Sequence, residues 1–161
     1  MGFGELLGRA LVIGVGATFI FDLWGLLLHR LFGTPLPNWA LVGRWFCHVP
    51  RGKLVHQSIG DAAPVAGELG WGWFFHYAVG VSFALATLLI GGAAWAKAPT
   101  WPLPLAVGLI TVLCGWLILA PGMGAGIAAR LKPNANQIRL LNIAAHTVFG
   151  FAMYGIALLI R

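Results

Sequence analysis

Apolar residues in this chain gather into four long runs, which are separated by segments that hold most of the charged side chains. The runs cover about residues 10–32, 71–95, 101–120 and 140–160. Each approaches the roughly 20 apolar residues that a helix needs to cross about 30 Å of hydrocarbon. The pattern therefore predicts an all-α, polytopic membrane protein, with residues 1–161 forming a single integral membrane domain, a bundle of four transmembrane helices.

Composition supports the same class and excludes a water-soluble globule. The 161 residues are 60% hydrophobic and only 9% charged, and the mean hydropathy is +0.88. A soluble chain of this size needs more polar groups to cover its surface. The opening residues, MGFGELLGRA, lack the basic start, short apolar stretch and small-residue cleavage site of a signal peptide. The first run is therefore expected to stay in the protein as a helix.

The basic residues are divided unevenly between the two ends of the predicted spans. One side holds Arg30, Arg44, Arg51, Lys53, Arg130, Lys132 and Arg139, and the other holds Arg9, Lys97 and Arg161. The positive-inside rule then places loops 33–70 and 121–139 in the cytoplasm and both termini outside it. Basic residues beside spans usually meet lipid head groups, so the partner is the bilayer and not a nucleic acid. Cys47 and Cys114 fall toward the cytoplasm, where thiols stay reduced.

The spans resemble one another at fixed offsets. The third run matches the first at an offset of 92, and the fourth matches the second at an offset of 70, where His76 and Gly80 align with His146 and Gly150. This pattern suggests two similar helical hairpins in the same orientation, as in transport folds with parallel repeats.

The first loop, residues 33–70, is too long for a plain connection. Residues 38–48 are rich in aromatic side chains, and Asn38 is a plausible helix N-cap. We expect a short interfacial helix there, with its aromatic residues in the membrane interface and Arg44 and Arg51 toward the head groups. The rest of the loop is rich in Gly, Ala and Pro, which fits either an ordered cap or a mobile loop.

Asp22 is a carboxylate in the middle of the first apolar run. An ionisable side chain at the centre of a membrane helix costs roughly 2.5–3.5 kcal/mol on insertion scales. Small and polar residues recur with it at helical spacing, and His76 and His146 lie on similar stripes in the second and fourth runs. The candidate intramembrane site comprises Asp22, His76, His146, Cys114, Thr18, His29 and Asn142.

The residue types of this site allow several chemistries. Intramembrane carboxylates and histidines are typical of proton relays and ion sites, although they can also serve only to pack helices. His76 and His146 could ligate a metal or a haem iron, but no C-x-x-C-H motif is present for covalent haem attachment. A second set, Cys47, His48, His56 and Glu68, lies in the first loop and could bind a metal or act in catalysis. The segment Pro121–Gly126 is expected to break the third helix in a close turn.

Several stretches together resemble a known family. They are GVGATFIFDLWGLLLHRLFG, NWALVGRWFCHVPRGKLVHQSI, GWFFHYAVGVSF, PGMGAGIAA and AAHTVFGFAMYG. They are similar to a bacterial family of four-span inner-membrane proteins catalogued only as a domain of unknown function. The resemblance covers nearly the whole chain and implies a location in the bacterial inner membrane. It implies no activity, substrate or cofactor.

Three functions fit these observations. The first is transport or permeation of a small solute or ion, with Asp22 as the responsive carboxylate and a homo-oligomer as the working form. The second is a membrane redox or metal-handling protein that holds a metal or haem between His76 and His146. The third is an accessory subunit of a larger membrane complex. An enzyme is less favoured, because the sequence shows no recognisable nucleophile constellation.

Overall fold

The computed structural model describes residues 1–161, and all of its regular elements are helical. Four long segments have the length and hydropathy to cross a membrane: α1 (Phe3–Phe32), α3 (Glu68–Lys97), α4 (Pro102–Cys114) continued to Gly122, and α6 (Ala135–Leu159). The predicted all-α class with four spans is confirmed. Helix α1 begins at Phe3, earlier than its apolar run, and in this first part Glu5 and Arg9, one turn apart, form an ion pair of 3.0 Å.

Short helical elements connect the spans. The predicted helix in the first loop is α2 (Trp39–His48), and the Asn38 side chain caps it by accepting from the backbone N–H of Leu41 at 3.3 Å. Two single helical turns follow α2. The third span ends in a π-helical turn and a short helix, and one more single turn comes after it. These elements are η1 (Val49–Arg51), η2 (Ile59–Asp61), η3 (Gly115–Leu119), α5 (Ala120–Gly122) and η4 (Ile127–Ala129).

The chain divides into two compact units, and α3, the third span and α6 each contribute to both. Unit 1 contains Met1–Leu36, Tyr77–Thr111 and Ile143–Arg161. Unit 2 contains Pro37–His76 and Val112–Asn142.

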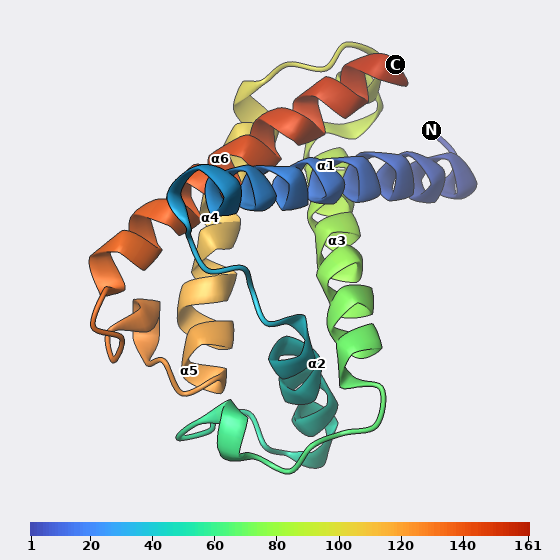
Figure 1. Ribbon diagram of the computed structural model, residues 1–161. Helices are drawn as coiled ribbons and strands as arrows, with labels where there is room; N and C mark the ends of the chain where they lie inside the picture. Colours follow the sequence, from blue (N-terminus) through green and yellow to red (C-terminus); the bar gives the residue numbers. More distant parts are fainter. The chain divides into compact units, whose positions relative to one another are not determined.

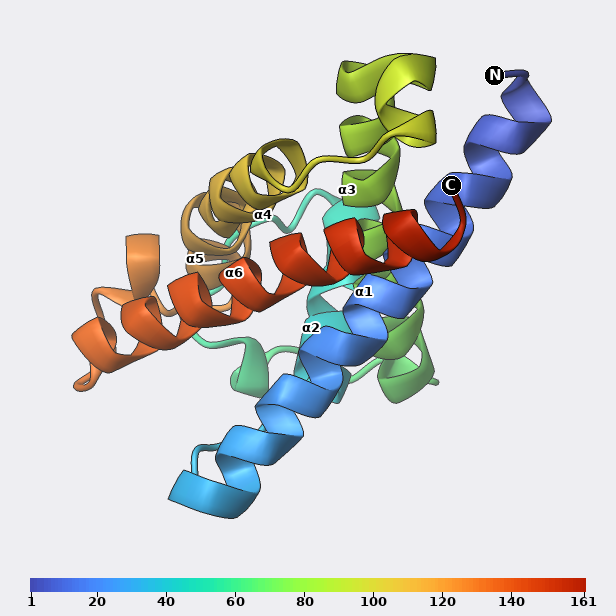
Figure 2. The same cartoon turned by 90° about the horizontal axis from the view of Figure 1, so that it is seen from above.

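The helices of unit 1 cross at positions that carry small residues. Figure 1 shows α1 crossing α3, and Figure 2 shows α6 passing over α1. At the first crossing a Cβ on Gly14 would collide with the backbone of Val81, and one on Gly80 would collide with the hydroxyl of Thr18. Helices α4 and α6 approach in the same way, since a Cβ on Gly150 would lie 2.8 Å from the Cα of Leu105. Such contacts let helix backbones approach closely in a membrane.

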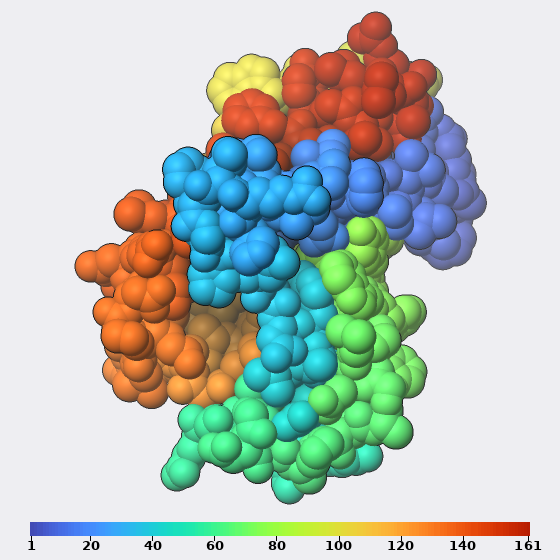
Figure 3. All heavy atoms as spheres, viewed as in Figure 1, coloured from blue at the N-terminus to red at the C-terminus, as the bar shows by residue number.

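Unit 2 packs α2 against the start of α3 and the end of the third span. A Cβ on Gly43 would meet the carbonyl of Glu68, and one on Gly72 would meet the carbonyl of Trp39. A Cβ on Gly122 would strike the Trp45 ring. In Figure 3, α2, the loop after it and the start of α3, coloured teal to green, form one continuous mass of side chains.

The Gly-rich segment after the third span turns as the sequence predicts. Gly124 and Gly126 have φ angles of +86° and +71°, which lie in the left-handed region that favours glycine. Gly124 also packs so closely on the backbone of Gln57 that a Cβ would collide with its carbonyl. Both glycines therefore serve the turn, and Gly124 also permits its close contact with the first loop.

Candidate functional site

Asp22 lies in unit 1 and is hydrogen-bonded to a tyrosine on another span. The Tyr77 hydroxyl of α3 donates to the Asp22 carboxylate at 3.0 Å. Asp22 is half-buried and lies ten residues before the end of α1, about 15 Å along the helix. The structure thus gives the intramembrane carboxylate a polar partner within the same unit.

The predicted polar stripe on α1 is buried at one end and exposed at the other. Thr18 is fully buried, and its hydroxyl donates to the carbonyl of Gly14 at 2.7 Å. His29 is exposed near the end of the helix, where its Nδ1 lies 2.8 Å from the carbonyl of Thr34. Thr18 supports the crossing with α3, whereas His29 caps the segment that leaves α1.

His146 lies at the crossing of α4 and α6. Its Nδ1 is 3.0 Å from the carbonyl of Gly108 and 3.2 Å from the hydroxyl of Thr111, which itself donates to Gly108 at 2.7 Å. Because a carbonyl only accepts, Nδ1 carries the proton and Nε2 holds the lone pair of the neutral ring. Phe21 of α1 contacts the imidazole edge to face, with ring centroids 5.8 Å apart.

His76 lies in unit 2 in a group of aromatic rings. Its imidazole stacks on Trp39 of α2 with ring centroids 3.9 Å apart, and Trp73 contacts it edge to face at 6.0 Å. Because Trp39 begins α2, the imidazole of His76 takes part in fastening the short helix to α3.

Cys114 and Asn142 both lie in unit 2. Cys114 is exposed and immediately precedes the π turn η3. The amide of Asn142 donates to the carbonyl of Ile138 at 3.3 Å and accepts from the indole of Trp116 at 3.2 Å. Trp116 is part of the π turn, so this hydrogen bond links the irregular turn to α6.

The seven intramembrane candidates thus belong to different units. Thr18, Asp22, His29 and His146 are in unit 1, and His76, Cys114 and Asn142 are in unit 2.

The loop candidates of unit 2 come together in part. Nδ1 of His48 lies 3.1 Å from Nε2 of His56, and the two rings are tilted with centroids 5.2 Å apart. Nε2 of His48 also contacts the carbonyl of Ala63 at 3.0 Å, and Nδ1 of His56 contacts that of Gly122 at 2.9 Å. Cys47 is half-buried next to His48 in α2. The two histidines form a hydrogen-bonded pair, defined here as the His48–His56 pair.

Glu68 forms an ion pair with Arg44, which the sequence analysis places toward the lipid head groups. The Nε and Nη2 atoms of Arg44 donate to its two carboxylate oxygens, each at 2.8 Å. Arg44 is only 9% exposed, so its expected position toward the lipid head groups is wrong. The face of α2 that carries Arg44 turns toward α3. There the Glu68 carboxylate pairs with the guanidinium, whose charge would otherwise be buried without a partner.

Arg44 also organises the loop that follows α2. Its Nη1 donates to three backbone carbonyls, those of Ile59 at 3.3 Å, Gly60 at 3.0 Å and Ala62 at 3.0 Å. The hydrogen bond with Glu68 raises the pKa of Arg44 above its ordinary value. One guanidinium therefore ties the 59–62 segment to the start of α3, and the loop forms an ordered cap within unit 2.

A polar hollow of about 440 Å³ opens beside the His48–His56 pair. It is lined by His48, Lys53, His56, Gln57, Ser58, Asp61, Ala62 and Ala63. In residues 1–161 no three His, Cys, Asp or Glu side chains lie close enough together to hold a metal ion.

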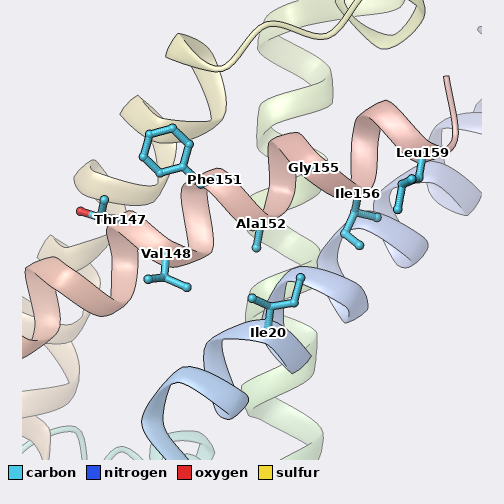
Figure 4. A pocket seen from close by; sticks show the side chains of 8 residues that line it. All are labelled: Ile20, Thr147, Val148, Phe151, Ala152, Gly155, Ile156 and Leu159. Carbon is cyan, nitrogen blue, oxygen red and sulfur yellow. The ribbon is translucent and has the colours of Figure 1, made fainter. Parts of the chain in front are cut away.

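A larger hollow of about 530 Å³ lies in unit 1 between α1 and α6 (Figure 4). It is lined by Ile20, Thr147, Val148, Phe151, Ala152, Gly155, Ile156 and Leu159. Thr147 is the one polar side chain among them, and its hydroxyl donates to the carbonyl of Ile143 within α6. This groove therefore suits apolar chains and offers little to a charged ligand.

Three residues at these sites were missed by sequence reasoning. Tyr77 sits directly after His76, and its pairing with Asp22 depends on how α1 crosses α3. Arg44 was used to predict the topology and was placed toward the head groups, and its acidic partner, Glu68, was not recognised. Trp39 was assigned to the interface, whereas its ring covers His76. A search for opposite charges within the first loop, residues 33–70, could have found the Arg44–Glu68 pair.

Comparison with known proteins gives one assignment. A search of curated proteins and a search of solved structures found no match. The family model DUF2938, described as a protein of unknown function, matches residues 11–160. This match covers α1 from residue 11 and all of the other three spans, and it includes the Asp22–Tyr77 hydrogen bond and the His48–His56 pair. The chain therefore belongs to the DUF2938 family, whose function is unknown, and its four candidate spans indicate a multi-pass membrane protein.

Proposed function

We propose that this protein transports a small solute or ion across the bacterial inner membrane, and that Asp22 is the group that binds the proton or cation. The observation that carries the proposal is the hydrogen bond from the Tyr77 hydroxyl to the Asp22 carboxylate, inside two candidate spans of unit 1. Carboxylates at such positions commonly mark ion pathways and proton relays.

The chemistry of this hydrogen bond suits a group that binds and releases a cation. An ionised carboxylate only accepts hydrogen bonds, whereas a protonated one also donates. Binding of a proton or cation at Asp22 therefore changes what Tyr77 can do, and Tyr77 lies on the helix that crosses α1. The occupancy of Asp22 can in this way alter the contact between two spans.

The other intramembrane candidates have supporting roles in this proposal. His146 is another titratable group within the spans of unit 1, and its ring contacts Phe21, the neighbour of Asp22. His76 is the titratable ring among the candidates in unit 2. A bundle of four helices has little room for a transport pathway within a single chain. We therefore propose a homo-oligomer that associates through small residues that make no helix contacts within the chain. Gly4 and Gly8 have open space above them.

The orientation follows from charge. The loops that contain Lys53 and Lys132 face the cytoplasm, and both termini lie outside it, because most basic residues lie on that one side of the spans.

Flux measurements on purified protein in liposomes test the proposal. Wild type should dissipate an imposed proton or cation gradient, and Asp22→Asn, which keeps the size of the side chain but cannot ionise, should reduce the flux by tenfold or more. Glu5→Gln is the matched control, because Glu5 is an exposed carboxylate on the same helix. Equal flux through wild type and Asp22→Asn across a panel of ions and small solutes would contradict the proposal.

A further inference from the structure

The His48–His56 pair has more hydrogen-bond acceptors than two neutral imidazoles can satisfy. The carbonyl of Ala63 requires a proton on Nε2 of His48, and the carbonyl of Gly122 requires one on Nδ1 of His56. The remaining nitrogens, Nδ1 of His48 and Nε2 of His56, lie 3.1 Å apart. A hydrogen bond between them needs one proton more.

Counting protons fixes the charge of this arrangement. Two neutral imidazoles carry one N–H each, and both are used by the carbonyls. If no further proton is present, two lone pairs face each other at 3.1 Å and repel. If two are added, two N–H groups face each other and repel as well. Only a pair with three N–H hydrogens, and hence one net positive charge, forms all three hydrogen bonds.

We propose that His48 and His56 form a proton-binding site, in which one proton shared between the rings fastens the first loop to the end of the third span. This site lies in the loop and is independent of the function proposed for Asp22. Its ligand is a single proton, reached through the polar hollow of about 440 Å³ beside the pair.

The contacts around His56 explain what the proton holds in place. Both the backbone N–H and the ring of His56 engage the carbonyl of Gly122, at 3.2 Å and 2.9 Å. Three residues further on, the N–H of Ile59 donates to the carbonyl of Met123 at 3.3 Å. His48 is 3% exposed and fixed in α2, so the shared proton connects this helix to the contact between the loop and Gly122.

Charged side chains of both signs surround the pair. Lys53 and Asp61 line the same hollow, and Glu68, which interacts electrostatically with His48, is already paired with Arg44. Cys47 is the neighbouring titratable group on α2, and Arg51 follows on η1. The segment from Ala120 to Gly126 contributes no titratable side chain. Together these side chains carry one more positive than negative charge, so the extra proton is held by the three hydrogen bonds of the pair and not by a surplus of anions.

The test is nitrogen-15 NMR of histidine-labelled protein in lipid nanodiscs, combined with amide hydrogen exchange across a pH series. We expect a scalar coupling across the hydrogen bond between Nδ1 of His48 and Nε2 of His56. Exchange protection of the amides of His56 and Ile59, corrected for intrinsic rates, should pass through a maximum and fall about tenfold on both the acid and the alkaline side, because one of the three hydrogen bonds is lost on each.

Variants separate the pair from general effects of pH. In His48→Gln the coupling and the maximum in protection should both disappear, while His29→Gln, which alters an exposed histidine in unit 1, should leave both unchanged. The coupling and the maximum in protection are both measured in wild type, so together they decide the matter even if His48→Gln fails to fold. Absence of the coupling at every pH, or protection that changes in one direction only, would overturn the proposal.

Discussion

Arg44 of α2 and Glu68 at the start of α3 form a bidentate ion pair with both hydrogen bonds at 2.8 Å. The same guanidinium also donates to three loop carbonyls. Lysine would keep the charge but could not reproduce the planar fork. We therefore expect Arg44→Lys to lower the Tm in detergent by several degrees, and Arg51→Lys, at an exposed position, to leave it unchanged. Equal Tm values for the two variants would contradict this account of the loop.

The hydrogen bond between Tyr77 and Asp22 gives a second prediction. Tyr77→Phe removes only the hydroxyl that donates to the carboxylate. If Asp22 binds a proton or cation during transport, this change should alter the flux of reconstituted protein, by a smaller factor than Asp22→Asn does. Tyr154→Phe, on α6, is the matched control and should transport as wild type. Unchanged flux in Tyr77→Phe would show that the hydrogen bond has no part in transport.

The crossing of α1 and α3 depends on the absence of a side chain at Gly80. Alanine there would place a Cβ against the Thr18 hydroxyl, and such overpacking usually costs about 1–3 kcal/mol. Gly25 lies within α1 with open space around it, so alanine there should stabilise the helix by roughly 0.5–1 kcal/mol. Thermal unfolding of Gly80→Ala and Gly25→Ala should thus shift the Tm in opposite directions. Shifts of the same sign would argue against the close crossing.

Two tryptophans differ in whether the indole N–H has a partner. Nε1 of Trp45 donates to the carbonyl of Leu54 at 2.9 Å, whereas Nε1 of Trp24 is buried without a hydrogen bond. Phenylalanine removes similar atoms at both positions but leaves an unpaired carbonyl only in the first case. Trp45→Phe should therefore be more destabilising than Trp24→Phe by about 1–3 kcal/mol. Denaturation of both variants in the same detergent measures the difference directly.

The proposed orientation can be tested by cysteine labelling. In a background with Cys47 and Cys114 replaced by alanine, Lys53→Cys places a single exposed thiol in the first loop, and Lys97→Cys places one at the end of α3. A membrane-impermeant maleimide should label Lys97→Cys in intact spheroplasts, and Lys53→Cys only after permeabilisation. The reverse pattern would place the first loop outside the cytoplasm.

The length and hydropathy of the four runs were enough to predict the spans, because each must satisfy its backbone hydrogen bonds within a helix. The cap at Asn38 and the turn at Gly124 were also predictable, since both depend on local chemistry. The pairing of Tyr77 with Asp22 was not, because it is set by how two helices cross on Gly14 and Gly80. Arg44 was misplaced because its partner, Glu68, lies beyond the reach of any helical periodicity.

The contacts between α2 and the start of α3 have a consequence for how the chain assembles during synthesis. The ion pair of Arg44 with Glu68, the stacking of Trp39 on His76 and the close approach of Gly43 to Gly72 all lie within residues 38–76. Gly122, which His56 engages, follows nearly fifty residues later. The short helix can therefore dock on α3 before the third span has left the ribosome, and the Gly-rich turn then closes onto a partner that is already folded.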